Sequence, residues 1–248
     1  MHVQYWIFFK GLLVGDLGES KILKEPVTKL LVERLPATFS LAAVAMGIAM
    51  VMALPLGVLS AVYRDTWIDR VAKIIAFLGQ SSPQFWIAIM LMILFSVLLG
   101  WLPVAGRSGP SSYVLPGFVM GWFVIAGLVR LTRSSMLDVL DSDYITMARG
   151  KGLHERTVIW KHALRNAMIP VLTYSGLILG GFMNGSVVIE AVFAWPGIGR
   201  LALDAVQGRD YPVVQGVVIM VGVFFVVINL LVDITYAIVN PRIKYSTS

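Results

Sequence analysis

The chain has 248 residues, of which 58% are apolar and 14% are charged, and its mean hydropathy is +0.81. An average soluble domain has roughly 45–50% apolar and about 25% charged residues, so this chain has too little polar surface to cover a core in water. The composition therefore argues against a soluble globular enzyme and indicates a protein whose solvent is lipid. The absence of cysteine excludes a disulfide framework, thiolate catalysis and thiolate metal sites.

Five stretches are apolar and long enough to cross a bilayer as helices, which takes about 20 residues each. They cover residues 37–63, 71–99, 113–129, 168–189 and 213–239. The sequence GQSSPQ interrupts the second stretch around Pro83, where a proline is tolerated if neighbouring helices satisfy the freed backbone groups. We therefore predict an all-α polytopic membrane protein with an external segment over 1–36, a transmembrane domain over 37–243 and a cytoplasmic tail over 244–248.

The basic residues between the predicted spans are divided unequally, and short loops rich in Lys and Arg stay on the cytoplasmic side of a membrane. The connections on one side carry twelve: Arg64, Arg70, Lys73, Arg130, Arg133, Arg149, Lys151, Arg156, Lys161, Arg165, Arg242 and Lys244. The short connections on the other side carry three: Arg107, Arg200 and Arg209. We expect the richer side to be cytoplasmic, and the C-terminus with it.

With five spans, the segment 1–36 would lie outside, although it carries five basic residues and no signal peptide. A charged N-terminus with no hydrophobic segment to carry it across is implausible. We therefore expect a further span before Met1 in the complete protein, which would make six.

The predicted cytoplasmic connection over 141–165 orders its cations around two glycines. Its start, Asp141–Ser142–Asp143, favours a helix N-terminus, because such side chains cap free N–H groups and acids suit the positive helix end. A short helix to Arg149 would end at a turn formed by Gly150 and Gly152. A second helix over 154–164 would follow, with Val158, Ile159 and Leu164 spaced to face a common partner.

Three interpretations of this connection compete. A basic loop on anionic lipid headgroups, at about 1 kcal/mol per basic residue, would explain the sign of the charge but not the ordered glycines or the apolar positions. A nucleic-acid or substrate surface is disfavoured by the membrane spans on both sides. A docking element for a cytoplasmic partner accounts for all of these features and is our interpretation.

Several segments carry a family resemblance: ERLPATFSL (33–41), GWLPVAGRSG (100–109), YITMARGKGL (144–153), KHALRNAMIPVLT (161–173), VVIEAVFAWPGIGRL (187–201) and NLLVDITYAIVNPRI (229–243). Together they resemble ABC-importer permeases of the dipeptide/oligopeptide/nickel branch over essentially the whole chain. The superfamily's small-residue loop pattern falls on Thr146, Met147, Ala148 and Gly152, of which only Ala148 and Gly152 match. The peptide branch commonly departs from the pattern in this way.

The resemblance implies a type I importer permease that forms half of a translocation path and docks on cytoplasmic ATPases. The implied docking residues are Tyr144, Ala148, Arg149, Lys151, Gly152, Leu153 and Arg156. The chain has no GxxxxGK[ST] phosphate-binding loop, so we expect no bound cofactor here and ATP use by two partner subunits. The resemblance also implies a second, related permease and an external solute-binding protein, in addition to the surrounding lipid, and it implies no nucleic acid.

Outside this connection the candidates are weaker, and we expect no catalytic residue or metal site. The loop over 192–212 would face the binding protein with Arg200, Asp204, Arg209 and Asp210. Polar residues within spans suggest function by their cost, which makes Asn184, Glu190 and Asp233 candidates for the path, although Asp233 favours a structural role.

Two alternatives and the identity of the solute stay open. An ion-gradient-driven secondary transporter is the main alternative, although no inverted repeat is evident. A structural membrane scaffold would cause no transport defect on deletion. A serine protease around GRSG (106–109) fails because His2, His154 and His162 all lie outside the spans. The solute could be a dipeptide, an oligopeptide, glutathione, a nickel chelate or an oligosaccharide.

Overall fold

The computed structural model describes residues 6, 9–12, 14–185 and 187–239, without the side chains of 183–185, 233 and 235–239. The helices are α2 (Val27–Val62), α3 (Trp67–Ser81), α4 (Gln84–Met92), α5 (Val114–Leu140), α6 (Asp143–Gly150), α7 (Glu155–Thr157), α8 (Leu164–Gly185), α9 (Val187–Val192), α10 (Ile198–Gln207) and α11 (Tyr211–Val239). Short π-helical segments cover Ile93–Leu98 and Val158–Ala163, and a 3₁₀ turn covers Pro110–Tyr113. Within the described residues, β pairing is limited to one bridge between Glu19 and Pro26. The all-α prediction is confirmed.

Three helical segments in the described part of the chain are long and apolar enough to cross a membrane. They are Val27–Val62, Pro110–Leu140 and Tyr211–Val232. The pair formed by Trp67–Ser81 and Gln84–Leu98 meets the same requirement only as a unit, with a bend of 102° between its halves. Because α8 is not among these segments, five spans remain a prediction.

The observed helix bounds differ from the predicted spans in three places. Helix α2 begins ten residues before the predicted span, because its first turns carry Val27, Leu30 and Leu31, which are buried in a core. Helix α5 continues past residue 129 and takes up cations that were expected in a connection. The predicted span over 71–99 is broken at Ser82, which is extended (φ −104°, ψ 139°) because proline at the next position disfavours the helical conformation.

The chain forms two compact units, which are described separately. Unit 1 comprises Met1–Val44, Gln84–Val119 and Gly180–Val227. Its hydrophobic core joins the start of α2 to α10 and to the start of α11: Val27, Leu30, Leu31, Ile198, Leu201, Ala205, Val213 and Val217. Gly216 permits this approach, since a Cβ there would lie 2.5 Å from the Val27 side chain.

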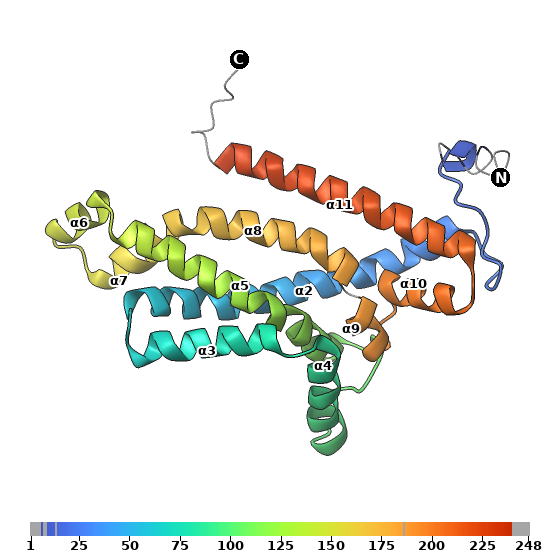
Figure 1. Ribbon diagram of the computed structural model, residues 1–248, viewed down its shortest axis with the longest axis horizontal. Helices are drawn as coiled ribbons and strands as arrows, with labels where there is room; N and C mark the ends of the chain where they lie inside the picture. Colours follow the sequence, from blue (N-terminus) through green and yellow to red (C-terminus); the bar gives the residue numbers. More distant parts are fainter. Residues whose placement is uncertain (1–5, 7–8, 13, 186, 240–248) are drawn as a thin grey trace, which may run out of the picture. The chain divides into compact units, whose positions relative to one another are not determined.

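Unit 2 comprises Ala45–Pro83, Met120–Leu179 and Ile228–Ser248. Its core joins the end of α2 to α5, α6, α8 and the π-helical segment: Val58, Ala61, Met136, Ile145, Ala148, Val158, Ala163 and Ala167. Figure 1 shows α6 and α7 together at one end of these helices, with α3 beside the later part of α2. Unit 2 thereby places the predicted docking connection on a packed base.

Candidate functional site

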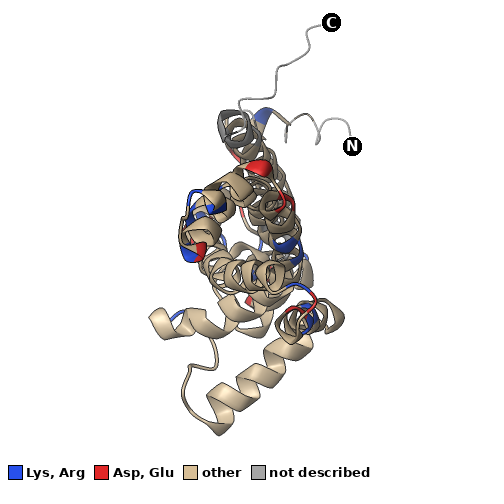
Figure 2. Ribbon diagram, turned by 90° about the vertical axis from the view of Figure 1, so that its left-hand side faces the viewer, with Lys and Arg blue, Asp and Glu red and all other residues tan. Residues whose placement is uncertain are grey.

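The cations of the connections between predicted spans follow the division into two units, and the five basic residues of the N-terminal segment also lie in unit 1. All described members of the richer, predicted cytoplasmic set lie in unit 2, between Arg64 and Arg165. The three members of the poorer set, Arg107, Arg200 and Arg209, lie in unit 1. Figure 2 shows the charged residues as blue and red segments on an otherwise mostly tan ribbon. The side assignment made from charge therefore coincides with a structural division of the chain.

Helix α6 begins where the sequence predicts, but its capping differs. Ser142 is the N-cap with extended backbone (φ −83°, ψ 150°), and Asp143 occupies the first turn, where its charge complements the helix dipole. The Ser142 hydroxyl donates to the Val139 carbonyl instead of accepting from an N–H group of α6. The expected side-chain cap is therefore absent at Ser142, because its hydroxyl closes the end of α5.

Only one of the two glycines in the following turn needs to be glycine for its backbone. Gly152 has φ +76°, in the left-handed region that costs other residues about 1–2 kcal/mol. Its N–H donates to the Arg149 carbonyl at 2.9 Å, while the Lys151 N–H donates to the Met147 carbonyl at 3.0 Å. Gly150 is the last residue of α6, and it is not among the residues with positive φ. The predicted helix–glycine–helix order is present, with Gly152 as the residue that forms the turn.

The small and apolar residues of the connection pack inward. Ala148 is 9% exposed, Ile145 is fully buried, and both belong to the core of unit 2. Val158 is buried in the same core, and Ile159 and Leu164 pack against it. Val158, Ile159 and Leu164 thus face one common surface, as their spacing predicts, and that surface is the core of unit 2. Ala148 is small because it packs within this chain, and its side chain offers little surface to a partner.

A charge-assisted bond joins the two sides of the turn. Arg149 donates to both carboxylate oxygens of Glu155, at 2.7 Å from Nη2 to Oε1 and 3.2 Å from Nε to Oε2. The hydrogen bond lowers the pKa of Glu155 and raises the pKa of Arg149. The sequence reasoning did not single out Glu155, although it is the only acid among the cations between 144 and 165.

Tyr144 is also held within the chain. Its hydroxyl accepts from Nδ2 of Asn166 at 2.7 Å and lies 3.4 Å from the His162 carbonyl. Tyr144 is nevertheless 41% exposed, Leu153 is exposed to the same extent, and Met147 is 62% exposed. With exposed Lys151 and Arg156, these side chains form a mixed apolar and basic surface, which we call the α6–α7 surface.

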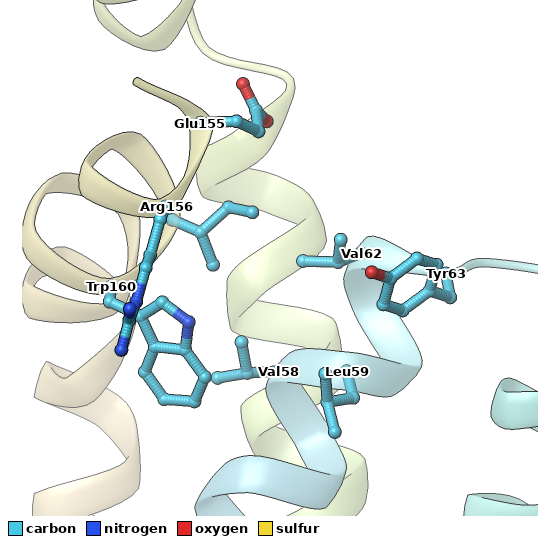
Figure 3. A pocket seen from close by; sticks show the side chains of 8 residues that line it. Val58, Leu59, Val62, Tyr63, Glu155, Arg156 and Trp160 are labelled. Carbon is cyan, nitrogen blue, oxygen red and sulfur yellow. The ribbon is translucent and has the colours of Figure 1, made fainter. Parts of the chain in front are cut away.

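A hollow of about 270 Å³ lies beside this surface (Figure 3). It is lined by the last turns of α2 and by the residues that follow the glycine turn: Val58, Leu59, Val62, Tyr63, Glu155, Arg156, Ile159 and Trp160. Figure 3 shows the indole of Trp160 pointing toward Val58, with Arg156 alongside it. The structure thus provides an open groove with a mostly apolar lining, to which one acid, Glu155, and one cation, Arg156, also contribute.

The family model for "Binding-protein-dependent transport system inner membrane component" matches residues 53–245. The chain belongs to this family. It is accordingly a permease: a multi-pass inner-membrane transport subunit of an ABC importer, and not an enzyme.

Curated relatives of this permease extend over nearly all of the chain. The glutathione transport system permease protein GsiC of Pectobacterium atrosepticum is 46% identical over 242 residues, which cover 98% of this chain and 79% of the relative. A putative peptide transport system permease protein of Brucella abortus is 48% identical over 238 residues, which cover 93% and 76%.

Solved structures agree on the fold. A chain of the inward-facing MetNI methionine ABC transporter matches with a TM-score of 0.74 at 20% identity, over 88% of this chain and all of the other. A chain of an amino acid ABC transporter crystallised with histidines matches with a TM-score of 0.62 at 17% identity, over 87% and 95%. The permease therefore has the fold of type I ABC importer permeases.

Of the three candidates for the translocation path, the structure describes the side chain of one. Asn184 in α8 and Asp233 in α11 have side chains outside the described residues. Glu190 is fully buried, accepts from the Thr38 hydroxyl at 2.8 Å and from the Arg200 N–H at 3.0 Å, and belongs to α9. Its carboxylate therefore holds the start of α10 against α2.

The four candidates for contact with the external binding protein differ in how exposed they are. Asp210 is 2% exposed and accepts from the Ser20 hydroxyl at 2.6 Å and from the N–H groups of Lys21 and Ile22. Its role is thus to hold the N-terminal segment, not to offer a charge to a partner. The Arg200 guanidinium donates to the Ala194 carbonyl at 2.7 Å, and only Asp204 and Arg209 remain well exposed.

Proposed function

We propose that this permease imports glutathione or short peptides as half of a translocation path, driven by two separate cytoplasmic ATPases. The observation that carries the substrate class is the identity of 44–48% to permeases named for glutathione and peptide transport. Because this likeness covers at least 93% of the chain, it includes the helices of both units.

The α6–α7 surface is the part of the permease that we assign to ATPase docking. Its exposed apolar residues Met147 and Leu153 can bury area against a partner, and Lys151 and Arg156 can pair with acids there. The Arg149–Glu155 bond and the core beneath Ala148 keep the surface preformed, which reduces the ordering cost of binding. A preformed element on a packed base is also what transmits a rigid-body movement.

The remaining partners follow from the proposed import function. A second, related permease would complete the path, and an external binding protein would deliver solute, with Asp204 and Arg209 of unit 1 as exposed candidates for its contact. The described basic residues of the richer, predicted cytoplasmic set all lie in unit 2. This supports a cytoplasmic position for the α6–α7 surface and, with it, for the C-terminus. Hydrolysis of ATP takes place in the ATPases, and this chain binds none.

Reconstitution tests the proposal. The permease, its proposed second permease, ATPases and binding protein would be placed in proteoliposomes and given radiolabelled glutathione, a dipeptide or a pentapeptide. We expect uptake that needs ATP and the binding protein and stops with a non-hydrolysable ATP analogue. Uptake that follows an imposed proton or sodium gradient without ATP would identify a secondary transporter instead, and uptake of none of the three solutes would refute the substrate class.

A further inference from the structure

Unit 2 contains a buried carboxylate that neither the sequence reasoning nor the proposed docking surface uses. Asp69, in the first turn of α3, is completely buried. Its oxygens accept from Nε and Nη2 of Arg133 in α5, both at 2.9 Å, and from Nζ of Lys73 at 2.9 Å. The Ser60 hydroxyl of α2 and the Asp65 N–H complete the set. We call Asp69 and the three residues whose side chains bind it, Ser60, Lys73 and Arg133, the Asp69 cluster.

The Asp69 cluster joins three helices through a single side chain. The side chains that α3 otherwise buries are small, at Ala72, Ala76 and Gly79, so Asp69 is its largest buried side chain. The opposite face of α3 is open, with Trp67 71% and Phe77 70% exposed. Among the fully buried residues of α3, Asp69 is therefore the one that joins the helix to α2 and α5 by hydrogen bonds, while Ile68 and Ile75 are partly buried beside it.

A gain in folding stability does not by itself explain why an ion pair such as Asp69–Arg133 is buried here. Burying an ion pair costs desolvation that offsets much of its attraction, and apolar residues of similar volume often stabilise a fold as well. The fork of Arg133 instead fixes both the distance and the orientation between α5 and α3, because its two N–H groups bind the two carboxylate oxygens in one plane. The pair is thus suited to holding one particular helix arrangement.

Both helices that hold Asp69 also hold α6. On α2, Ser60 lies between Val58 and Ala61, which belong to the same core as Ile145 and Ala148 of α6. On α5, Arg133 lies one turn before Met136, which belongs to that core too. The Asp69 carboxylate is therefore connected to α6 through both α2 and α5.

We propose that Asp69 is a positioning residue that fastens α3 to α2 and α5, so that the movement of α6 driven by the ATPases is delivered to α3. This inference rests on the proposed function, because it assigns a role within ATP-driven import. Without the carboxylate, the ATPases still bind α6 and hydrolyse ATP. Helix α3 then no longer follows the movement of α6, and part of the conformational change that drives import is lost.

The test is the number of ATP molecules hydrolysed per solute imported by the reconstituted complex, measured for wild type and Asp69→Asn. We expect this ratio to rise about fivefold or more in Asp69→Asn, within the usual size of coupling between sites, with ATP hydrolysis per assembled complex retained. A purely structural role would reduce hydrolysis and uptake together and leave the ratio unchanged, which would overturn the proposal.

Asp65→Asn is the matched control. It removes the same charge four residues away, from a side chain that is 79% exposed, and asparagine tolerates the positive φ of +62° at this position. We expect its ratio to equal that of wild type. If wild type itself shows no ATP-dependent uptake, the proposed function fails; if wild type imports but Asp69→Asn keeps its ratio, only this inference fails.

If Asp69→Asn prevents assembly of the permease with its partner subunits, Arg133→Lys provides a second test of the proposal. Lysine retains the charge but lacks the planar fork, so we expect a smaller rise of the ratio in the same direction. A wild-type ratio in Arg133→Lys would overturn the proposal as well.

Discussion

Replacing Gly152 by alanine separates backbone strain from side-chain packing at the turn between α6 and α7. A Cβ at Gly152 would meet no atom within 4 Å, so the substitution creates no clash inside the chain. Its effect comes from φ +76°, which an alanine adopts at a cost of about 1–2 kcal/mol. In the free permease the substituted turn relaxes, and docking must then restore the strained form. A cost of 1–2 kcal/mol corresponds to about 5- to 30-fold weaker binding of the ATPase.

Gly150→Ala is the matched control for this prediction. A Cβ at Gly150 would also meet no atom within 4 Å, but this glycine lies in α6 without positive φ, where alanine favours the helix by about 0.5–1 kcal/mol. Binding of purified ATPase to immobilised nanodiscs of the permease complex measures both variants. We expect Gly150→Ala to bind as wild type does or slightly more tightly. Equal affinity of Gly152→Ala and wild type would refute the role of the turn.

Three further predictions concern unit 1, each checked by thermal unfolding of the purified permease in detergent. Burial raises the pKa of Asp210, but its hydrogen bonds lower it more, so the pKa is lower in the folded than in the unfolded protein. The stability that Asp210 contributes is therefore present above its unfolded pKa and is lost as the pH falls through its folded pKa. Asp210→Asn should unfold at a lower temperature at neutral pH and lose less stability on acidification, and an unchanged dependence of its stability on acid pH would contradict this. Gly197→Ala should destabilise by about 1–3 kcal/mol, because its Cβ would lie 2.4 Å from the buried carboxylate of Glu190, whereas Gly47→Ala, with open space at its Cβ, should not; equal melting of the two would refute the argument. Trp195→Phe should cost about 0.5–1.5 kcal/mol for the lost hydrogen bond, because the Ala37 carbonyl on α2 loses its 2.9 Å indole donor but keeps the Ser40 hydroxyl at 3.0 Å, and melting at the wild-type temperature would exclude that cost.

The sequence predicted the local structure of the docking connection well, because its signals are local. Acid residues at the helix start and glycine at the turn act over a few positions, and both α6 and the left-handed Gly152 follow from them. Local signals do not say which side of a residue meets the rest of the chain. Ala148 and Val158 are buried in this chain's own core, a fact that depends on where α2 and α5 run.

Buried acids were the least predictable residues, because their partners are distant in the sequence. Glu190 is hydrogen-bonded to Thr38, 152 positions away, and Asp210 to Ser20, 190 positions away. Asp69 stands next to Arg70 and four residues before Lys73, so its sequence context suggests an ordinary solvated helix start. Asp69 is nevertheless buried, with Ser60 on α2 and Arg133, 64 positions away on α5, as partners that local sequence does not indicate.

The central claim, that the α6–α7 surface docks the ATPases, is tested most directly by site-specific cross-linking. The chain contains no cysteine, so a photoactivatable cross-linker on Lys151→Cys or Asp204→Cys has a unique attachment point. Both positions are exposed, the first in unit 2 and the second in unit 1. In the assembled, transporting complex we expect position 151 to cross-link to an ATPase subunit and position 204 not to. Cross-linking of the ATPase from position 204 but not from position 151 would contradict the account.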